Sequence, residues 1–260
     1  MTLSRRTTLR LGATTLAGLG LSAVMPRIAF TQNTMGDTYE TDDGTLTVSP
    51  ISHASLVLTT PSAVIYADPV GGAALYEGHP PPDLILVTHE HGDHYDPDTL
   101  SSLIGPDTRI VANPAVFDML PEALAAQAEA IGNGESTSFG DIGIDAIPAY
   151  NTTEDRLQYH PQGRDNGYVL TIGDTRVYIA GDTEDIPEMR ALENIDIAFV
   201  PMNLPYTMDE AQAASGVGAF APAVVYPYHY RGSDLDLFED LLGGENVETE
   251  VVRGPWYEDA

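Results

Sequence analysis

The chain has 260 residues, of which 43% are hydrophobic, enough for one domain with a substantial core. Its 39 acidic residues oppose 11 basic ones, all arginine, and the formal net charge is −28. Nucleic acid is therefore disfavoured as a partner, because binding to phosphate backbones requires many Lys and Arg side chains. The absence of cysteine excludes thiol nucleophiles, disulfides and cysteine-ligated metals.

The first residues are typical of an export signal. Arg5 and Arg6 precede a mildly apolar stretch at 11–24, as in twin-arginine signals. This stretch is shorter than the about 20 apolar residues that span a bilayer. We predict a signal over 1–30, a periplasmic or extracellular location and no stable membrane span after its removal. A short amphipathic tail or a retained membrane anchor is the alternative. Residues 31–43 are polar and acidic and are predicted to be a linker.

The first half of the remaining chain is predicted to open with strands. Apolar or alternating runs at 46–49, 56–59 and 63–67, separated by Ser, Thr and Pro, indicate a meander. Leu84–Val87 is wholly apolar, as expected of a strand buried on both faces.

Helices are predicted after this strand. Asp96 is a favourable N-cap and Pro97 a favourable first helical residue, so we expect a helix at 97–104. A strand at 109–112 follows, and then a helical stretch from 114 to 126 that breaks at Pro121.

The second half follows a similar plan. Several short strands are predicted between 127 and 150, and a hairpin turns at Gly173-Asp174 between strands at 167–172 and 175–180. Strands and helices then alternate, with helices at 187–192, 209–220 and 235–242 and strands at 195–200, 224–226 and 248–252. This pattern predicts a single α/β domain over 44–260, in which two sheets pack face to face and helices lie outside.

A dense group of metal-binding residue types directly follows the buried strand. Within six residues the chain carries His89, His91, Asp93 and His94. Imidazole nitrogens and carboxylate oxygens are the ligands that zinc prefers besides thiolate. A loop at the end of a buried strand also gives ligands a rigid base and an exposed tip. These four residues predict a metal site rather than a loop that collected His by chance.

The order His-x-His-x-Asp-His after a hydrophobic strand resembles the signature of the metallo-β-lactamase superfamily. Asp182, in Tyr-Ile-Ala-Gly-Asp-Thr, resembles the carboxylate that bridges two metals there, and His229, in Pro-Tyr-His, resembles the final ligand. The resemblance covers about residues 45–255. Ser52-His-Ala-Ser, Tyr66-Ala-Asp-Pro and Tyr159-His-Pro-Gln-Gly resemble the branch that contains ascorbate-6-phosphate lactonase-like proteins. The implied fold is a single-domain, four-layer αββα sandwich.

The resemblance also implies two divalent metal ions, with zinc expected first and manganese or iron as alternatives. Carried over position by position, the first ion would be held by His89, His91 and His160, the second by Asp93, His94 and His229, and both by Asp182.

His160 departs from the family pattern. The family often places this ligand after a strand that ends in Ala-Tyr-His, and here that place reads Ala149-Tyr150-Asn151. His160, nine residues later, is the only His between the first motif and His229. Asn151 or an open coordination position is the alternative.

Two further residues are candidates for a supporting role. Asp68 ends a predicted strand and either orients a ligand imidazole through its second ring N–H or forms a turn before Pro69. His53 lies beside a predicted strand and is either a core residue or a group that supports the ligands. His79 precedes three prolines and is expected at the surface.

The implied activity is hydrolysis of a small molecule. Two divalent ions lower the pKa of a bridging water from 15.7 towards about 7, and Asp93 would orient the resulting hydroxide and pass a proton to the leaving group. An ester or lactone bond is expected, with a phosphodiester or a β-lactam as alternatives. Lack of Lys disfavours a strongly phosphorylated substrate, although one of three arginines could bind one: Arg156, Arg164 or Arg231.

Specificity is expected to come from the polar loop between Ala149 and Gly167, with Asn203, Tyr206 and Tyr230 as further pocket candidates. Two other classes of function are considered. One is a non-catalytic metal-binding module. The other is a di-iron oxidoreductase, but that branch tends to carry Glu in place of His91 and needs a flavin module, for which no length remains. The sequence does not define an oligomeric state.

Overall fold

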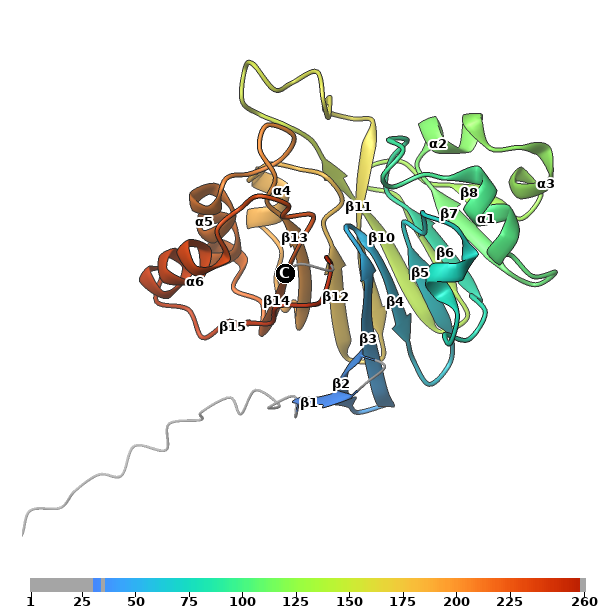
Figure 1. Ribbon diagram of the computed structural model, residues 1–260, viewed down its shortest axis with the longest axis horizontal. Coiled ribbons are helices and arrows are strands. Elements are labelled where there is room, and N and C mark those ends of the chain that lie inside the picture. The colour runs from blue at the N-terminus through green and yellow to red at the C-terminus, as the bar shows by residue number, and fades with distance from the viewer. Residues whose placement is uncertain (1–29, 34–35, 258–260) are drawn as a thin grey trace, which may run out of the picture.

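Two mixed β-sheets form the centre of the computed structural model, which describes residues 30–33 and 36–257 (Figure 1). The strands of the first sheet are adjacent in chain order: β1 (Phe30–Asn33), β2 (Gly36–Thr41), β3 (Gly44–Ser52), β4 (Ser55–Thr59), β5 (Val64–Ala67), β6 (Leu84–Val87), β7 (Arg109–Ala112) and β8 (Ala128–Ala130). Pairing is antiparallel from β1 to β5 and parallel from β5 to β8.

The second sheet repeats this change from antiparallel to parallel pairing. Its strands are β9 (Ser136–Phe139), β10 (Ile142–Ala149), β11 (Asp165–Ile172), β12 (Thr175–Ile179), β13 (Ile197–Pro201), β14 (Val224–Tyr228) and β15 (Glu250–Val251). The antiparallel part runs from β9 to β12 and the parallel part from β12 to β15. Because β6, β12 and β14 lie in the parallel parts, the loops after them begin at strand carboxyl ends, where parallel sheets commonly place ligand sites.

Helices cover the outer face of each sheet (Figure 1). The first sheet is covered by η1 (Ala73–Tyr76), α1 (Pro97–Leu103), α2 (Pro114–Met119) and α3 (Glu122–Ala125). The second is covered by α4 (Pro187–Arg190), α5 (Glu210–Phe220) and α6 (Leu235–Gly244). The expected four-layer αββα sandwich is therefore confirmed. Within the described part of the chain, no helix has the length and hydrophobicity needed to cross a bilayer.

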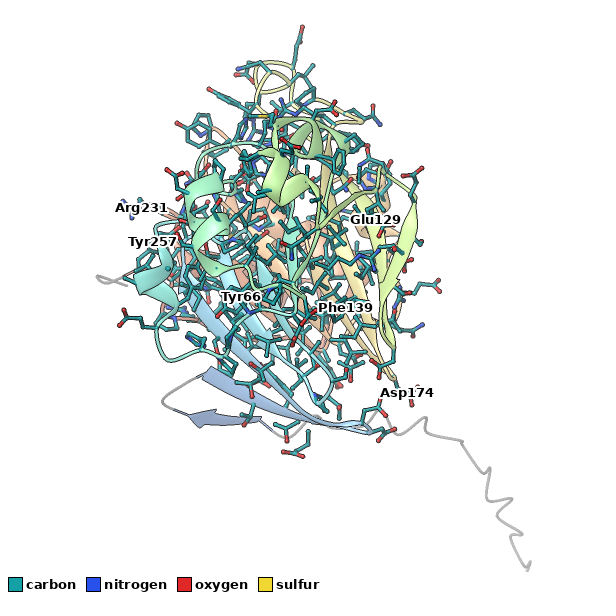
Figure 2. All side chains as sticks on the ribbon, turned by 90° about the vertical axis from the view of Figure 1, so that its right-hand side faces the viewer. Tyr66, Glu129, Phe139, Asp174, Arg231 and Tyr257 are labelled. Carbon is teal, nitrogen blue, oxygen red and sulfur yellow. The ribbon has the colours of Figure 1, made fainter. Side chains whose placement is uncertain are left out.

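The core has two parts, and β6 contributes to both. Leu84 and Leu86 pack in the large cluster between the sheets, whereas Ile85 and Val87 pack in the smaller cluster beneath the helices of the first sheet. All four side chains are fully buried, as their uninterrupted apolar sequence predicts. Burial of each such side chain contributes about 1.5–3 kcal/mol. The strand that carries the metal-binding motif is thus firmly anchored, and side chains fill the space between the sheets (Figure 2).

Most predicted elements are present, with local corrections. The helical stretch at 114–126 is two helices, because Leu120 before Pro121 adopts an extended conformation, as residues before proline prefer. The final strand is shorter than the predicted 248–252 and covers Glu250–Val251. Asp96 caps α1 as expected, and Asp209 caps α5.

The expected linker at 31–43 is the main correction. This segment contributes β1 and β2 to the first sheet, with β2 paired along β3. Tyr39 in β2 is buried in the core between the sheets, and its hydroxyl lies within hydrogen-bond distance of the Tyr226 hydroxyl. Asp37 of the same strand is also buried and accepts a hydrogen bond from the Tyr226 hydroxyl at 2.8 Å, so two side chains tie β2 to the second sheet. The polar residues around Tyr39 conceal this in the sequence. The predicted signal, apart from residue 30, lies outside the described residues.

Candidate metal centre

Four loops bring the predicted ligand residues to one end of the two sheets. His89, His91, Asp93 and His94 follow β6, Asp182 follows β12, and His229 directly follows β14, while His160 lies in the loop between β10 and β11. The structure brings together all seven residues, which come from segments up to 140 positions apart in the sequence.

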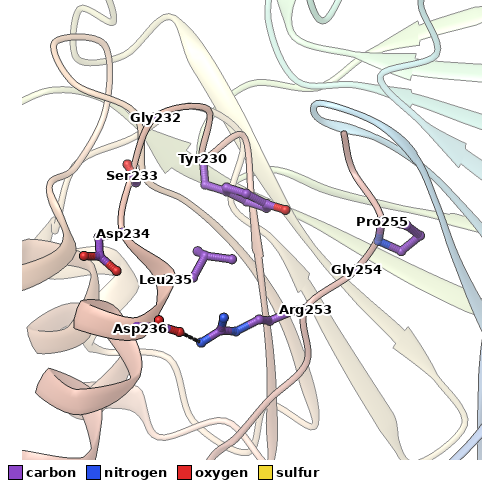
Figure 3. A pocket seen from close by; sticks show the side chains of 9 residues that line it. All are labelled: Tyr230, Gly232, Ser233, Asp234, Leu235, Asp236, Arg253, Gly254 and Pro255. Atoms are coloured by element: carbon purple, nitrogen blue, oxygen red, sulfur yellow. Dashed lines mark hydrogen bonds and ion pairs between the residues drawn. The ribbon is translucent and has the colours of Figure 1, made fainter. Parts of the chain in front are cut away.

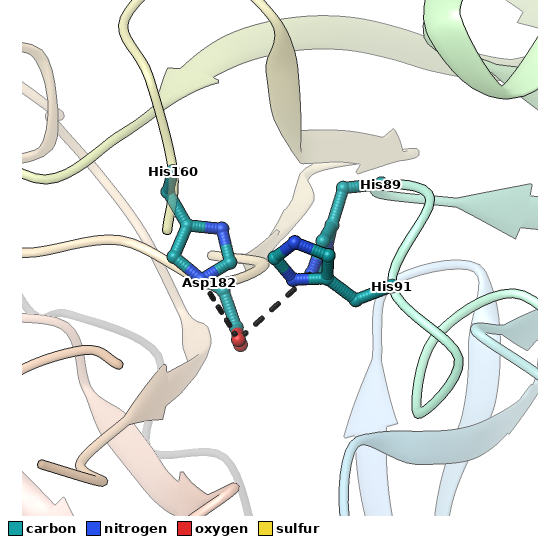
Figure 4. A group of neighbouring side chains, drawn as sticks. All are labelled: His89, His91, His160 and Asp182. Atoms are coloured by element: carbon teal, nitrogen blue, oxygen red, sulfur yellow. Dashed lines mark hydrogen bonds and ion pairs between the residues drawn. The ribbon is translucent and has the colours of Figure 1, made fainter. Parts of the chain in front are cut away.

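The first cluster consists of His89, His91, His160 and Asp182, and one ligand atom of each lies within 4.8 Å of the others. Figure 4 shows the three imidazoles and the carboxylate converging on one point. His89 Nε2 lies 3.1 Å from His91 Nδ1, and His160 Nε2 lies 3.4 Å from Asp182 Oδ2. Ligand bonds of 2.0–2.1 Å place two ligands of one tetrahedral ion about 3.3 Å apart, so these separations suit a shared metal.

The second cluster consists of Asp93, His94, Asp182 and His229. Asp182 Oδ1 lies 3.3 Å from His94 Nε2, and its Oδ2 lies 3.3 Å from His229 Nε2. Asp93 joins through Oδ2, which is 3.4 Å from His229 Nε2. Asp182 therefore faces both clusters, as a bridging carboxylate would.

Several buried atoms of the clusters lack hydrogen-bond partners among the described residues. These atoms are His94 Nε2, His160 Nε2, Asp182 Oδ1 and both ring nitrogens of His229. A buried polar group without a partner costs free energy, and a bound cation removes that cost. Their nitrogen and oxygen donors are also the ligand types that zinc takes. The residues present therefore fit a pair of divalent ions.

The charges of the site favour cation binding. Burial opposes ionisation of Asp182, but the neighbouring His229 and His94 outweigh it and hold the pKa of its carboxyl well below the usual value. The pKa of Asp93 is also lowered, because the neighbouring His229 and His53 outweigh the effect of burial. Burial lowers the pKa of His89, which keeps its imidazole neutral and its lone pair available. The two ionised carboxylates and the neutral His89 thus have the protonation states that metal binding requires. Asp182 and Asp68 outweigh burial at His94 and raise its pKa, so this imidazole must release a proton when a cation binds.

Asp68 supports the second cluster. Its Oδ2 lies 2.8 Å from His94 Nδ1, and the backbone N–H and the hydroxyl of Thr88 also donate to this carboxylate at 2.7 and 2.6 Å. With its proton on Nδ1, His94 directs the lone pair of Nε2 towards Asp182. The structure thus places Asp68 where the orienting role was expected.

Asp165 supports the first cluster and was missed in the sequence. Its Oδ2 lies 3.1 Å from His160 Nδ1, and Arg164 donates to both of its oxygens at 2.6 and 2.9 Å. Arg164 also pairs with Glu90, between His89 and His91, at 2.8 Å. One arginine therefore joins two of the loops that carry the first cluster. The available signal was an acidic residue five positions after His160, which the sequence alone does not distinguish from other loop acids.

Asn151, the alternative ligand, forms hydrogen bonds with backbone groups. Its side-chain amide donates to the carbonyls of Arg156 and Tyr206, and its backbone N–H donates to the His160 carbonyl at 2.8 Å. The bonds to Arg156 and His160 close the loop 151–160 on itself, and the bond to Tyr206 ties it to the loop after β13. His160 directs its Nε2 at Asp182, whose Oδ2 lies 3.4 Å away.

The remaining candidates are dispersed. His53 lies where the supporting role was expected, as its Nε2 is 3.2 Å from Asp93 Oδ2. His79, expected at the surface, is partly buried in a small cleft beside Tyr66 and Tyr76. Tyr206 is exposed, whereas Tyr230 is buried and lines a cleft of about 800 Å³ between α6 and the segment 253–255 (Figure 3). No residue of either cluster lines this cleft.

Comparisons with known proteins agree with this geometry. The beta-lactamase superfamily domain matches residues 47–229. A metal-dependent hydrolase from Thermococcus kodakarensis is 30% identical over 181 residues, which cover 66% of this chain and 79% of that protein. A crystal structure described as a metal-dependent hydrolase from Parabacteroides distasonis is 43% identical, covers 83% of this chain and 97% of its own, and has a TM-score of 0.76.

A more distant structure shares the fold alone. CmlA, a diiron β-hydroxylase from Streptomyces venezuelae, is 19% identical, with a TM-score of 0.62 over 80% of this chain and 53% of that one. The family match, the hydrolase relatives and the seven converging residues together show that the chain belongs to the metallo-β-lactamase superfamily and is a metal-dependent hydrolase.

Proposed function

We propose that the protein is a binuclear hydrolase that cleaves an ester or lactone bond in an uncharged small molecule with an apolar part. The observation that carries the binuclear assignment is the position of Asp182 between the clusters. Its Oδ2 lies 3.4 Å from His160 Nε2 of the first cluster and 3.3 Å from His229 Nε2 of the second, and its Oδ1 lies 3.3 Å from His94 Nε2. His89, His91 and His160 would hold the first ion, and Asp93, His94 and His229 the second. Two bound divalent ions, for which zinc is the first expectation, would lower the pKa of water and polarise the scissile bond.

Asp93 is the residue best placed for proton transfer. Its side chain is 50% exposed, whereas that of Asp182 is 3% exposed. An incoming substrate therefore meets Asp93 before it meets the buried carboxylate. Asp93 can accept a proton from the attacking water and deliver it to the leaving alkoxide, as general acid–base catalysis requires. During this transfer, Asp68 keeps the imidazole of His94 oriented and Asp165 keeps that of His160 oriented.

The arginines near the centre support an uncharged reacting group. Arg156 is paired with Glu184 at 3.0 Å, and Arg164 is paired with Asp165 and Glu90. Neither cation is free to neutralise a phosphate, which phosphoryl transfer would need beyond the metals. Arg231 lies over the ring of Tyr257. The pairing of Arg156 and Arg164 with carboxylates favours an ester or lactone over a phosphodiester.

An apolar rim on the loop that carries His160 and on the loop after β13 that contacts it supports a substrate with an apolar part. The rim consists of Leu157, Leu204 and Tyr206, which are 45%, 52% and 46% exposed. Leu157 lies in the loop that carries His160, and Tyr206 contacts Tyr159 of that loop with ring centroids 5.1 Å apart. Exposed apolar residues gathered beside a reactive centre commonly bind ligand.

The loop that carries this rim is held in place by Glu184, two residues after Asp182. Its Oε2 accepts hydrogen bonds from the backbone and hydroxyl groups of Thr152 and Thr153. Arg156 continues the network to the Thr207 carbonyl. The rim is thus built on an anchored loop, so its apolar side chains stay exposed instead of collapsing onto the core.

Metal content and a substrate panel test the proposal. Purified protein is expected to hold two zinc ions per chain and to hydrolyse aryl esters or lactones faster than a phosphodiester or a chromogenic β-lactam, with activity lost in chelator and restored by zinc. Fast cleavage of the phosphodiester would contradict the substrate class. Two iron ions without hydrolysis would favour an oxidoreductase such as the diiron relative of this fold. No metal would favour a binding module.

We further propose that residues 1–30 direct export by the twin-arginine route, on the basis of Arg5 and Arg6 before the apolar stretch. The full chain, expressed in a bacterium with this pathway, is expected in the periplasm or the medium. The double variant Arg5→Lys with Arg6→Lys should remain in the cytoplasm. Equal export of the variant would contradict the proposal.

A further inference from the structure

The C-terminal segment reaches the metal centre although it lies beyond the matched superfamily domain. The backbone N–H of His53 donates to the Trp256 carbonyl at 3.2 Å, and the Tyr257 hydroxyl lies 2.7 Å from His53 Nδ1. Trp256 is fully buried and contacts the rings of Tyr228 and Phe199, which fixes this segment on the second sheet. Tyr257 is therefore held at a defined position beside His53.

The other side of His53 faces the second cluster. Its Nε2 lies 3.2 Å from Asp93 Oδ2, and its ring lies against that of His229 with centroids 3.9 Å apart. The backbone N–H of His229 donates to the His53 carbonyl at 2.9 Å. His53 thus connects the C-terminal segment to two residues of the second cluster.

The direction of these hydrogen bonds follows from the chemistry of the groups. An ionised carboxylate only accepts, so Nε2 of His53 must carry the hydrogen that faces Asp93. Nδ1 of the neutral ring then accepts, and the donor is the Tyr257 hydroxyl. Burial raises the pKa of Tyr257 to about 12, so this hydroxyl keeps its proton. The chain of donors runs from Tyr257 through His53 to Asp93.

The backbone supports a specific role for His53. Its φ is 53°, and that of His229 is 47°, in the left-handed region that residues other than Gly, Asn and Asp rarely adopt. Such conformations cost about 1–3 kcal/mol each and persist where the surrounding structure imposes them. Here the hydrogen bond between the two backbones joins both residues, and both imidazoles are directed at Asp93.

We propose that His53 and Tyr257 are positioning residues that hold Asp93 towards the second metal position. This inference rests on the proposed function. Asp93 is half exposed, so without a donor its carboxylate would turn between the site and solvent. His53 fixes one oxygen, and Tyr257 fixes the tautomer of His53, as residues behind metal ligands do. Tyr257 lies at the edge of the molecule beside Arg231 (Figure 2), whose guanidinium covers its ring at 5.0 Å.

The positioning role of His53 and Tyr257 is tested by the zinc affinity of the full-length protein. This affinity is measured by competition with a chromogenic chelator. Tyr257→Phe keeps the ring and removes the donor, and should weaken the second ion about tenfold, with the first ion unchanged. His53→Ala should weaken it up to about 100-fold. His53→Gln keeps an N–H within reach of Asp93 and should recover part of that loss. Tyr66→Phe, which removes a hydroxyl bonded to Pro80, is the matched control.

The outcomes separate this inference from the proposed function. If wild-type protein binds two ions and both Tyr257→Phe and His53→Ala bind them with unchanged affinity, the positioning role is wrong and the binuclear site stands. Wild-type protein without a second ion overturns both. Circular dichroism melting of each variant identifies loss of fold, and the difference between His53→Ala and His53→Gln remains informative when both are destabilised equally. Equal affinity in these two variants contradicts the role.

Discussion

The two clusters of the metal centre differ in how exposed their least buried ligand is, although Asp68 holds the buried His94 of the second as Asp165 holds His160 of the first. In the first cluster, His160 is buried and bonded to Asp165, which Arg164 joins to Glu90. In the second, Asp93 is half exposed and its carboxylate is held by His53 and His229. The difference indicates a division of labour. The first cluster provides a rigid anchor, whereas the second leaves a reactive carboxylate open to substrate.

Removal of the residue that both clusters share should have the largest effect. Asp182→Ala is expected to lower the metal content from two ions per chain to one or none. It should lower kcat/KM by about 1,000-fold or more, since metal ions supply several kcal/mol of transition-state stabilisation. Elemental analysis and steady-state kinetics measure both. The control is Asp174→Ala, at the hairpin turn between β11 and β12. An Asp182→Ala protein with two ions and full turnover would show that this carboxylate does not bridge.

A conservative change at the open carboxylate should affect turnover more than metal binding. Asp93→Asn keeps an oxygen for the second ion but loses the ability to accept and deliver a proton. We expect kcat to fall about 100- to 10,000-fold, with at most one ion lost and little change in KM. A kcat within threefold of wild type would remove Asp93 from proton transfer and would weaken the comparison between an anchoring and a reactive cluster.

The carboxylates behind the imidazoles offer a test of the two clusters separately. Asp165→Asn should weaken the first ion by about 10- to 100-fold, and Asp68→Asn should weaken the second by a similar factor, because each orients one ligand imidazole. Chelator competition resolves the two dissociation constants. If each variant weakens both ions equally, the clusters are not independent, and the proposed division between them is wrong.

The sequence predicted the parts of this molecule that are set by local patterns. The wholly apolar Leu84–Val87 is buried on both faces, and the residues after it converge with Asp182 and His229. Such predictions succeed because a strand and its following loop are encoded within a few residues. The family resemblance then supplied the distant partners, which no local pattern could connect.

The missed features all depend on contacts between segments far apart in the chain. Asp165 becomes meaningful only because His160 turns back onto it, and Tyr257 only because Trp256 packs on the second sheet beside His53. Polar composition concealed β2, whose position depends on the burial of Tyr39 between the two sheets. The residues that support the ligands can therefore be identified only from the structure, whereas the metal ligands of a dense motif can be identified from the sequence.

The smallest expected effect concerns the apolar rim on the His160 loop and the loop that contacts it. Tyr206→Ser and Leu157→Ser should each raise KM about tenfold for an aryl ester with a long acyl chain, equivalent to about 1.4 kcal/mol of lost contact, with kcat and metal content unchanged. The acetyl ester, which has little apolar surface, should be affected less. Leu237→Ser, an equally exposed leucine on α6, is the control. Equal KM values for wild type and rim variants on the long-chain ester would contradict substrate binding at the rim. A selective rise would show that the anchored first cluster also carries the surface that selects the substrate, while the open second cluster carries the chemistry.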